Sequence, residues 1–338
     1  MPTDRPTMKD VAARAGVSRA LVSIVFRGAA GASEETRRRV VAAAEELGYV
    51  RDQSARSLRT GRSYQLGVVF DSRDDFHTDL LDACYRVADE KGYELLLSAS
   101  TPRRSQERAV ETLVAARVLG LVVLGARTAP EPPRTPDRVP VVVVGCHEGS
   151  GLDVVRSDEE RGVRDAVHHL VELGHRRIAC IEATGHQGGL ARVRGYRSAM
   201  AEFGLDEHVR ILPGDFTHLA GTVAARRLLS DGELPTAVLA ANDLCAVGVL
   251  QVLRSEGVDV PGAVSVVGFD GTSDRGVREL DLTTVLQDVD VLADRVLETL
   301  VGRALTGPGP AAEKVVPARL VLGSTTARPS VRAPRSTG

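Results

Sequence analysis

The segment from residue 8 to residue 58 constrains the fold most, because it places two short helices, a third helix and a linker in direct succession. Thr7 can cap the first helix, with Asp10 three residues further on as in a capping box. Gly16 supplies a flexible turn residue, and Ser18 has the short side-chain oxygen that satisfies free N–H groups where a second helix begins. This order predicts a helix–turn–helix followed by one more helix.

The second helix has one face suited to the core and one suited to a partner. The side chains that can turn inward are Leu21, Val22, Val25 and Phe26. Those left on or near the open face are Arg19, Ala20, Ser23, Ile24 and Arg27. A short, basic face at a helix start suits insertion into a major groove. In the third helix, capped by Ser33 and ended by Gly48, the expected core residues are Val40, Val41, Ala44 and Leu47.

Charge separates the head of the chain from its body. Residues 1–62 hold 12 Lys and Arg against 7 Asp and Glu, a net charge of +5, whereas the rest of the chain has a net charge of −7. The formal charge of −2 for the whole chain hides this contrast. A basic head on an acidic body is the asymmetry expected when one end of a chain meets phosphate groups.

The head resembles the lactose/galactose repressor (LacI/GalR) family of bacterial transcription regulators. The resemblance is carried by KDVAARAGVS, by Val22-Ser23, and by SEETRRRV, ELGY and ARSLR. It implies a DNA-binding domain over residues 6–50, a hinge over residues 51–62, and a homodimer whose two heads read a near-palindromic operator in double-stranded DNA. The DNA contacts that it implies are Thr7, Ser18, Arg19, Ala20, Ser23, Ile24, Arg27, Ala55, Leu58 and Arg59.

Two positions qualify this picture. Within the resemblance, Leu58 wedges between bases at the centre of the operator while Ala55 allows close packing; otherwise Leu58 is a linker residue packed on its own domain. Ile24 stands where the family more often has Arg, so it cannot form a bidentate guanine contact. Contact with thymine methyl groups is then favoured, and we expect an operator that differs from the family's commonest sequences.

From Gln65 onward the pattern changes to strands alternating with helices. The runs that read as buried parallel strands are LGVVF, YELLL, LGLVVL, VVVV, RIACIEA, TAVLAA and VSVVGF. Helical spacing lies near residues 77–91, 104–117, 161–173, 190–203, 218–230 and 243–256. This predicts an α/β doubly wound fold in two halves.

The resemblance extends to this part of the chain, where it implies a periplasmic-binding-protein-like effector domain over residues 63–328. Lobe 1 is expected at about residues 63–160 plus 288–312, and lobe 2 at about 161–287 plus 313–328. The tail, residues 329–338, is rich in Pro, Ser and Arg and is expected to be disordered. Because ligands of open parallel sheets bind beyond the carboxyl ends of the strands, two facing lobes predict a cleft.

Several polar side chains follow a strand end and are candidates for this cleft. Asp270 follows VSVVGF, Asn242 follows TAVLAA, and Arg192 lies at a helix start with a fixed fork of donors. Phe216 could stack on the apolar face of a sugar or base. Each also has a structural reading: a helix cap for Asn242, a surface ion pair for Arg192, and ordinary core for Phe216. The family motifs R-x-x-G-[FY], A-N-D, G-D-[FW] and G-[FY]-D favour ligand roles for all four.

The first lobe departs from the family after its first strand. SRDDFHTD replaces the frequent Ser/Asn-Pro-Phe-Phe stretch, so Asp71 and Phe76 are candidate ligand contacts on weaker grounds.

No catalytic or metal-binding motif is visible. Cys84, Cys146, Cys180 and Cys245 form no Cys-x-x-Cys pair, and no Gly-x-Ser-x-Gly elbow or phosphate loop occurs. We therefore expect no enzyme activity, no cofactor and no metal. An N-terminal apolar stretch of signal-peptide or membrane-span length is also missing, so we expect a cytoplasmic protein without membrane contact.

Together these patterns predict a transcriptional repressor of a carbohydrate-utilisation operon that a small ligand, most simply a sugar, releases from DNA. Two alternatives remain open at this stage. The ligand could be a purine or nucleoside, since Arg192 and Asp270 suit either class. From another class, a transport binding protein would share the effector fold, but it would need an export signal and would lack the basic head, and a cytoplasmic sugar- or nucleotide-processing enzyme is the second such rival.

Overall fold

In a computed structural model, the chain forms two compact units, Met1–Ser63 and Tyr64–Gly338. The structure describes residues 6–26, 30–49, 63–72, 74–125, 135, 139–145, 151–273 and 279–330. Arg27, Ala55, Leu58, Arg59, Cys146, the predicted hinge and all but the first residues of the predicted tail lie outside the described residues.

The described part of the first unit, residues 6–26 and 30–49, contains the helices α1 (Met8–Ala15), α2 (Arg19–Phe26) and α3 (Glu34–Leu47). Gly16 ends α1 in the left-handed conformation, with φ of 65°, which glycine adopts without steric cost. The hydroxyl of Ser18 then accepts a hydrogen bond of 3.2 Å from the backbone N–H of Leu21, at the start of α2. These two residues build the predicted turn.

A small apolar core joins the three helices. Its buried members are Val11, Ala12, Ala15, Val22, Val25, Val40, Ala43 and Ala44. The prediction that Val41 belongs to this core is wrong, because its side chain is 44% exposed. Residues 40, 43, 44 and 47 share one face of α3 at helical spacing, whereas residue 41 is turned about 100° from residue 40.

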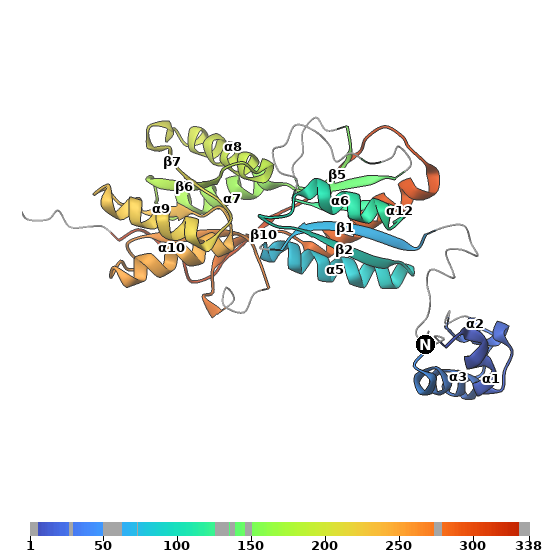
Figure 1. The fold of residues 1–338 in the computed structure, drawn as a ribbon. Coiled ribbons are helices and arrows are strands. Elements are labelled where there is room, and N and C mark those ends of the chain that lie inside the picture. Colours follow the sequence, from blue (N-terminus) through green and yellow to red (C-terminus); the bar gives the residue numbers. More distant parts are fainter. Residues whose placement is uncertain are drawn as a thin grey trace, which may run out of the picture. The chain divides into compact units, whose positions relative to one another are not determined.

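The second unit contains two six-stranded sheets flanked by helices (Figure 1). The first sheet has the order β11-β5-β4-β3-β1-β2, all parallel. Its strands are β1 (Gln65–Asp71), β2 (Glu94–Ser100), β3 (Leu121–Leu124), β4 (Val141–Val144), β5 (Asp153–Ser157) and β11 (Glu313–Val316). Helices α5 (Asp75–Lys91) and α12 (Val289–Thr306) pack on one face, and α6 (Gln106–Ala115) packs on the other.

The second sheet has the order β12-β10-β9-β8-β6-β7. Its strands are β6 (Ile178–Ala183), β7 (Arg210–Gly214), β8 (Ala237–Leu239), β9 (Ser265–Asp270), β10 (Thr283–Leu286) and β12 (Arg319–Val321), of which only β12 is antiparallel to its neighbour. Helices α7 (Glu159–Glu172) and α8 (Gln187–Glu202) cover one face, and α9 (His218–Ser230) and α10 (Asp243–Ser255) cover the other.

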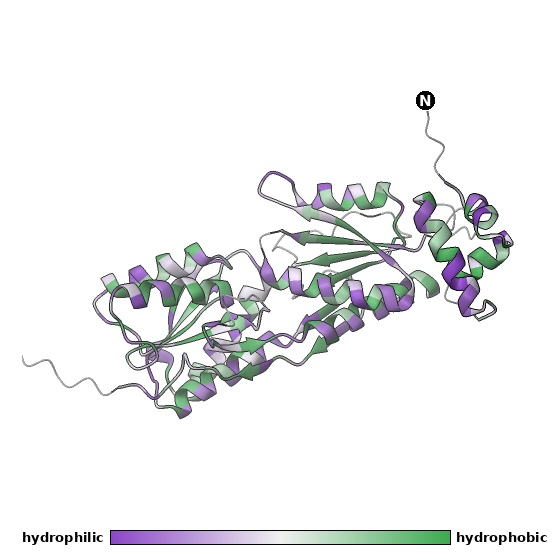
Figure 2. Cartoon of the chain, turned by 90° about the horizontal axis from the view of Figure 1, so that it is seen from below, coloured by the Kyte–Doolittle hydropathy of each residue, from purple (hydrophilic) through white to green (hydrophobic). Residues whose placement is uncertain are grey.

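Burial on both faces explains why the central strands read as continuous apolar runs. In β3, Leu121 and Val123 face the helix α6, whereas Val122 and Leu124 face α5 and α12. Figure 2 shows the strands mostly in the hydrophobic colour and the helices in both colours, as expected for a sheet enclosed between two helical layers.

The chain passes between the two sheets three times: from β5 to α7, from β10 to α12, and from β11 to β12. The predicted assignment of residues 313–316 to the second lobe is wrong, because β11 pairs with β5 of the first sheet. The sequence patterns also missed β5, β7, β10, β11 and β12 as strands. These are short or lie at sheet edges, where polar residues interrupt the apolar run.

Among the described residues, no helix has both the length and the apolar character that crossing a membrane would require.

A test of the packing between α9 and α10 uses Gly221. A Cβ at this position would overlap the carbonyl oxygen of Cys245, a backbone atom that cannot rotate away. We expect Gly221→Ala to lower the free energy of unfolding by about 1–3 kcal/mol, measured by urea denaturation. Gly302→Ala in α12 is the matched control: its Cβ meets nothing within 4 Å, so a small gain is expected from helix propensity. Equal effects in the two variants would contradict this account.

Candidate functional site

A cleft of about 420 Å³ lies between the two lobes of the second unit, where the carboxyl ends of both sets of parallel strands meet. Five of the six predicted effector contacts line it: Asp71, Phe76, Arg192, Phe216 and Asp270. Such a volume fits a ligand of the size of a mono- or disaccharide.

Two glycines of α8 position Arg192. A Cβ at Gly189 would overlap the carbonyl oxygen of Ala183, so the absence of a side chain lets α8 start directly on the end of β6. A Cβ at Gly195 would lie 2.5 Å from the carbonyl oxygen of Glu160, so α8 also approaches α7 closely. The glycines of the segment GGLARVRGY therefore have a packing reason, and they bring Arg192 to the cleft.

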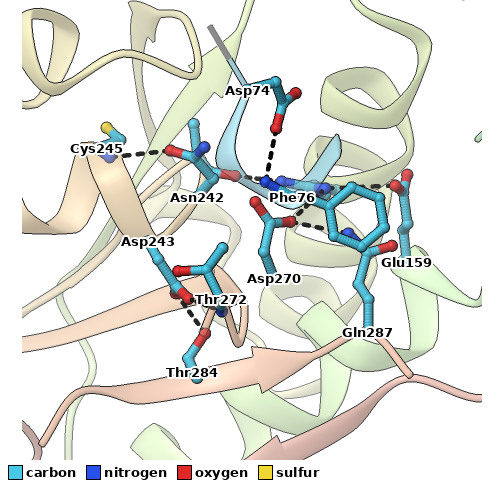
Figure 3. Close-up of polar contacts among 12 residues, drawn as sticks. Asp74, Phe76, Glu159, Asn242, Asp243, Cys245, Asp270, Thr272, Thr284 and Gln287 are labelled. Carbon is cyan, nitrogen blue, oxygen red and sulfur yellow. Dashed lines mark hydrogen bonds and ion pairs between the residues drawn. The ribbon is translucent and has the colours of Figure 1, made fainter. Parts of the chain in front are cut away.

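The guanidinium of Arg192 is the polar centre of the cleft floor. It donates to the carbonyl oxygen of Ala241, to Glu159 Oε1 at 3.4 Å and to Asp270 Oδ1 at 3.3 Å. Figure 3 labels the two acceptor carboxylates, Glu159 and Asp270. Its central carbon lies 3.7 Å from the ring centroid of Phe269 and 5.0 Å from that of Phe216. Arg192 is thus a buried ion-pair partner, and the surface reading of this residue is wrong.

Asp270 is held by neighbours on two elements. Besides Arg192, its Oδ1 accepts a hydrogen bond of 2.8 Å from Gln287 Nε2, at the second passage between the lobes. Burial raises the pKa of Asp270 well above its usual value, while the charge of Arg192 acts in the opposite direction. Ionising this carboxyl is therefore costly in its buried surroundings. Hydroxyl donors on a ligand would lower that cost.

Asn242, the sixth predicted contact, does not line the cleft in this structure. Its side-chain oxygen accepts a 2.9 Å hydrogen bond from the backbone N–H of Cys245, which makes it the N-cap of α10. Asp243 beside it accepts from the Thr284 hydroxyl at 2.5 Å and from the Thr272 backbone N–H at 2.9 Å. Both residues thus have structural partners that tie α10 to the strand ends.

The first lobe contributes the acidic residues Asp71 and Asp74 to the wall of the cleft. Asp71 ends β1, and Asp74 caps α5 by accepting from the backbone N–H of Phe76 at 3.1 Å. His77, which no sequence pattern indicated, is 5% exposed and accepts from the backbone N–H of Asp71 at 3.3 Å. Gly125 leaves room for its ring, since a Cβ there would lie 2.7 Å from it.

Among the cleft residues that the sequence patterns did not indicate are Ser157, Glu159 and Gln287. All three lie where the chain passes between the lobes, and Glu159 is the first residue of α7. A usable signal existed, because Ser157 ends the strand DVVRS. That strand was not recognised, so its end could not be placed in the cleft.

In the first unit, Thr7, Ser18, Arg19 and Ala20 are exposed, and Ser23 and Ile24 are half-buried. The carboxylate of Asp10 accepts from both the backbone N–H and the hydroxyl of Thr7 at 2.7 Å, which lowers the pKa of Asp10. These residues lie on α2 or at the helix starts. The basic group among them, Arg19, is available at the start of α2.

The described cysteines are packing residues. Cys84, Cys180 and Cys245 are free and buried, and burial raises the pKa of each thiol to about 12. A protonated buried thiol behaves as a small hydrophobe. In the described residues, no group of three His, Cys, Asp or Glu side chains could hold a metal ion.

Comparison with known proteins identifies the family. Residues 7–52 match "Bacterial regulatory proteins, lacI family", and residues 167–326 match "Periplasmic binding protein-like domain". The HTH-type transcriptional regulator CelR of Thermobifida fusca is 33% identical over 94% of this chain and 96% of its own length. The chain belongs to the LacI family. It is a DNA-binding transcriptional regulator with a helix–turn–helix head and a periplasmic-binding-protein-like body.

Two solved structures support the same fold. The lac repressor dimer bound to operator and the anti-inducer ONPF is 27% identical, with a TM-score of 0.75, and the match covers 96% of this chain and all of that one. A complex of the regulator CelR with cellobiose is 29% identical, with a TM-score of 0.69, over 95% of this chain and all of that one. The predicted family and fold class are confirmed.

The charge of Asp243 gives a pH-dependent test. Burial raises its pKa to about 6, so the folded state holds a proton that the unfolded state has lost between about pH 4 and pH 6. The contribution of this group to stability is therefore lost as the pH rises through 6. Asp243→Asn cannot titrate, so its stability relative to wild type should rise by about 1–3 kcal/mol over that interval.

The measurement is urea denaturation at several pH values, and the slope of the difference is the readout. Because Asp270 titrates in the same cluster, the slope reports the pair rather than one carboxyl. Asp294→Asn, on the exposed side of α12, is the control and should show no such slope. A difference between Asp243→Asn and wild type that is independent of pH would refute the assignment.

Proposed function

We propose that this regulator represses a carbohydrate-utilisation operon as a homodimer and leaves its near-palindromic operator when a sugar binds in the inter-lobe cleft. One observation carries the proposal: the same chain holds a LacI-type head and, in its body, a cleft with Arg192 and Asp270 joined at its floor. A protein made only to bind a ligand would need no such head. The protein is accordingly expected in the cytoplasm, where the DNA is.

The head supports the DNA part of the proposal. Arg19 and Ala20 are exposed at the start of α2, where a recognition helix contacts base edges. Residues 1–62 carry a net charge of +5, which favours phosphate. The relative bound to operator is a dimer, and a two-fold symmetric protein matches a near-palindromic site.

The cleft supports the sugar part. Buried Arg192, Asp270 and Gln287 offer both donors and acceptors, which is what a ring of hydroxyl groups requires. The CelR relative is known in complex with cellobiose. A purine or nucleoside is the alternative ligand, and a ligand screen that includes nucleosides distinguishes the two.

Switching follows from linkage between the two sites. A ligand that bridges both lobes favours one lobe arrangement, and it can shift DNA binding only by as much as it prefers that arrangement. Coupling of this kind is typically about 1–3 kcal/mol, or roughly 5- to 150-fold in operator affinity. The predicted hinge, residues 51–62, would transmit the change.

Operator binding gives the first test. Fluorescence anisotropy with a palindromic promoter fragment should show specific binding whose affinity falls steeply with salt, because phosphate contacts release counterions. Leu58→Ala should weaken specific binding at least tenfold by removing the wedge. Leu305→Ala, a 59% exposed residue of α12, is the matched control. Wild-type binding that is independent of both sequence and salt would contradict the DNA role.

Sugar binding gives the second test. Asp270→Ala leaves Arg192 and Gln287 without their shared acceptor, so we expect sugar affinity to fall about 10- to 100-fold in calorimetry. Operator release should then need proportionally more sugar. Asp294→Ala is the control. A sugar that binds Asp270→Ala and wild type equally well would show that its site is elsewhere.

A further inference from the structure

Three buried polar atoms at the floor of the cleft have no hydrogen-bond partner among the described residues. They are Ser157 Oγ, Glu159 Oε2 and Arg192 Nε. The three residues are only 2%, 5% and 8% exposed, and all three line the cleft. A buried polar group without a hydrogen-bond partner is destabilising, and more so when it is charged. The floor is therefore incomplete without a ligand that supplies at least one donor, to Glu159.

The charge of the cleft walls restricts that ligand. Five carboxylates line the described part of the cleft, against two guanidiniums. The carboxylates are those of Asp71, Asp74, Glu159, Asp215 and Asp270, and the guanidiniums are those of Arg104 and Arg192. A phosphate or carboxylate on the ligand would add to this excess of negative charge in a site of low dielectric.

Both guanidiniums are already bound by protein oxygens. Arg192 donates hydrogen bonds to the carboxylates of Glu159 and Asp270 and to the carbonyl oxygen of Ala241. Arg104 donates to Ser98 Oγ at 3.0 Å, to Thr112 Oγ1 at 2.8 Å and to the carbonyl oxygen of Ala99. An anionic ligand would have to break these bonds, whereas a cationic one would leave them in place.

Glu159 is the carboxylate best placed to receive a cation. Asp74 accepts a hydrogen bond from the backbone N–H of Phe76, and Asp215 accepts one from that of Thr217. Both carboxylates therefore already have a hydrogen-bond donor within their own turn. Glu159 keeps one oxygen unbound. Gly188 lies beside it, and a Cβ there would come within 2.9 Å of Glu159 Oε1 and 3.0 Å of Oε2. Because residue 188 has no side chain, the start of α8 packs directly against this carboxylate, and residue 188 places no side chain beside its unpaired oxygen.

We propose that the effector is an amino sugar whose protonated amine binds Glu159 Oε2, while neighbouring hydroxyl groups meet Ser157 Oγ and Arg192 Nε. An ammonium has three donors and no acceptor, so it matches a carboxylate oxygen that lacks a donor. Charge-assisted hydrogen bonds of this type are about twice as strong as neutral ones. The inference rests on the proposed sugar function and names the class of sugar.

Calorimetry on the full-length protein tests it with matched pairs: glucosamine against glucose, galactosamine against galactose, and mannosamine against mannose, with the N-acetylated forms included. For the pair that binds best, the amine should bind about tenfold or more tightly than its parent, which corresponds to about 1.4 kcal/mol. Acetylation removes the charge and should remove the preference. Raising the pH until the amine is neutral should do the same.

Variants then assign the preference to Glu159. Glu159→Gln should reduce the ratio of the two dissociation constants to about threefold or less, since it removes the charge and keeps the shape. Glu160→Gln, next in sequence and paired with Arg194 outside the cleft, should keep the wild-type ratio. Gly188→Ala should also lower the ratio, because its methyl group crowds the carboxylate, and it suits a helix better than glycine does.

The outcomes are separable. If the parent sugars bind and their amines bind no better, the amino-sugar inference is wrong and the proposed sugar function stands. If Glu159→Gln keeps the full preference for the amine, with an unchanged unfolding midpoint, the assignment to Glu159 is overturned. If no sugar in either form binds, the proposed function fails and this inference with it.

Discussion

The ion pair between Arg192 and Asp270 is the interaction on which the cleft depends. It joins α8 to the end of β9, and through Gln287 it reaches the point where the chain leaves the second lobe for the first. A buried charge needs a partner and further hydrogen bonds, and Arg192 obtains them from Ala241, Glu159 and two aromatic rings. The floor is therefore preorganised by charge and not by apolar packing alone.

Holding buried polar groups in place is unfavourable where they lack partners, and a ligand that pairs with them would reduce that free-energy cost. Asp270 is buried enough for its pKa to be raised, and Glu159 keeps an unpaired oxygen within the same cluster. Removing either partner of such a cluster leaves an uncompensated buried group, which is far costlier than the pair itself. A ligand that supplies hydrogen-bond donors to these groups would lower the free energy of the lobe arrangement that binds it. This is the thermodynamic requirement for an effector that biases one lobe arrangement.

The chain topology places several cleft residues in the segments that connect the two lobes. Three chain passages link the lobes, after β5, β10 and β11, and the first two carry the cleft residues Ser157, Glu159 and Gln287. Asp79 of α5 also accepts from the backbone N–H of Ser273 in the loop after β9, at 2.7 Å. Cleft residues and lobe connections thus share the same short segments.

Local chemistry in the sequence was enough to determine the helices of the head, the α/β class and five of the residues that line the cleft. Gly16, Ser18 and the apolar spacing of α1 and α3 act over a few residues, and buried central strands show as uninterrupted apolar runs. Arg192, Phe216 and Asp270 were found because they lie at helix starts or strand ends within recognisable motifs. Asn242 lies in such a motif too, yet it caps α10, since its oxygen is directed to the N–H of Cys245.

Only the tertiary structure decided which lobe receives β11, that Val41 faces solvent, and that Ser157, Glu159 and Gln287 meet at the cleft floor. The physical reason is the same for all three. The partner of β11 and the neighbours of a buried charge come from distant parts of the sequence, as with Glu159 and Asp270, which share Arg192, and the covered side of α3 is set by its packing against α1 and α2. Sequence patterns report period and local chemistry, whereas these contacts come from long-range packing.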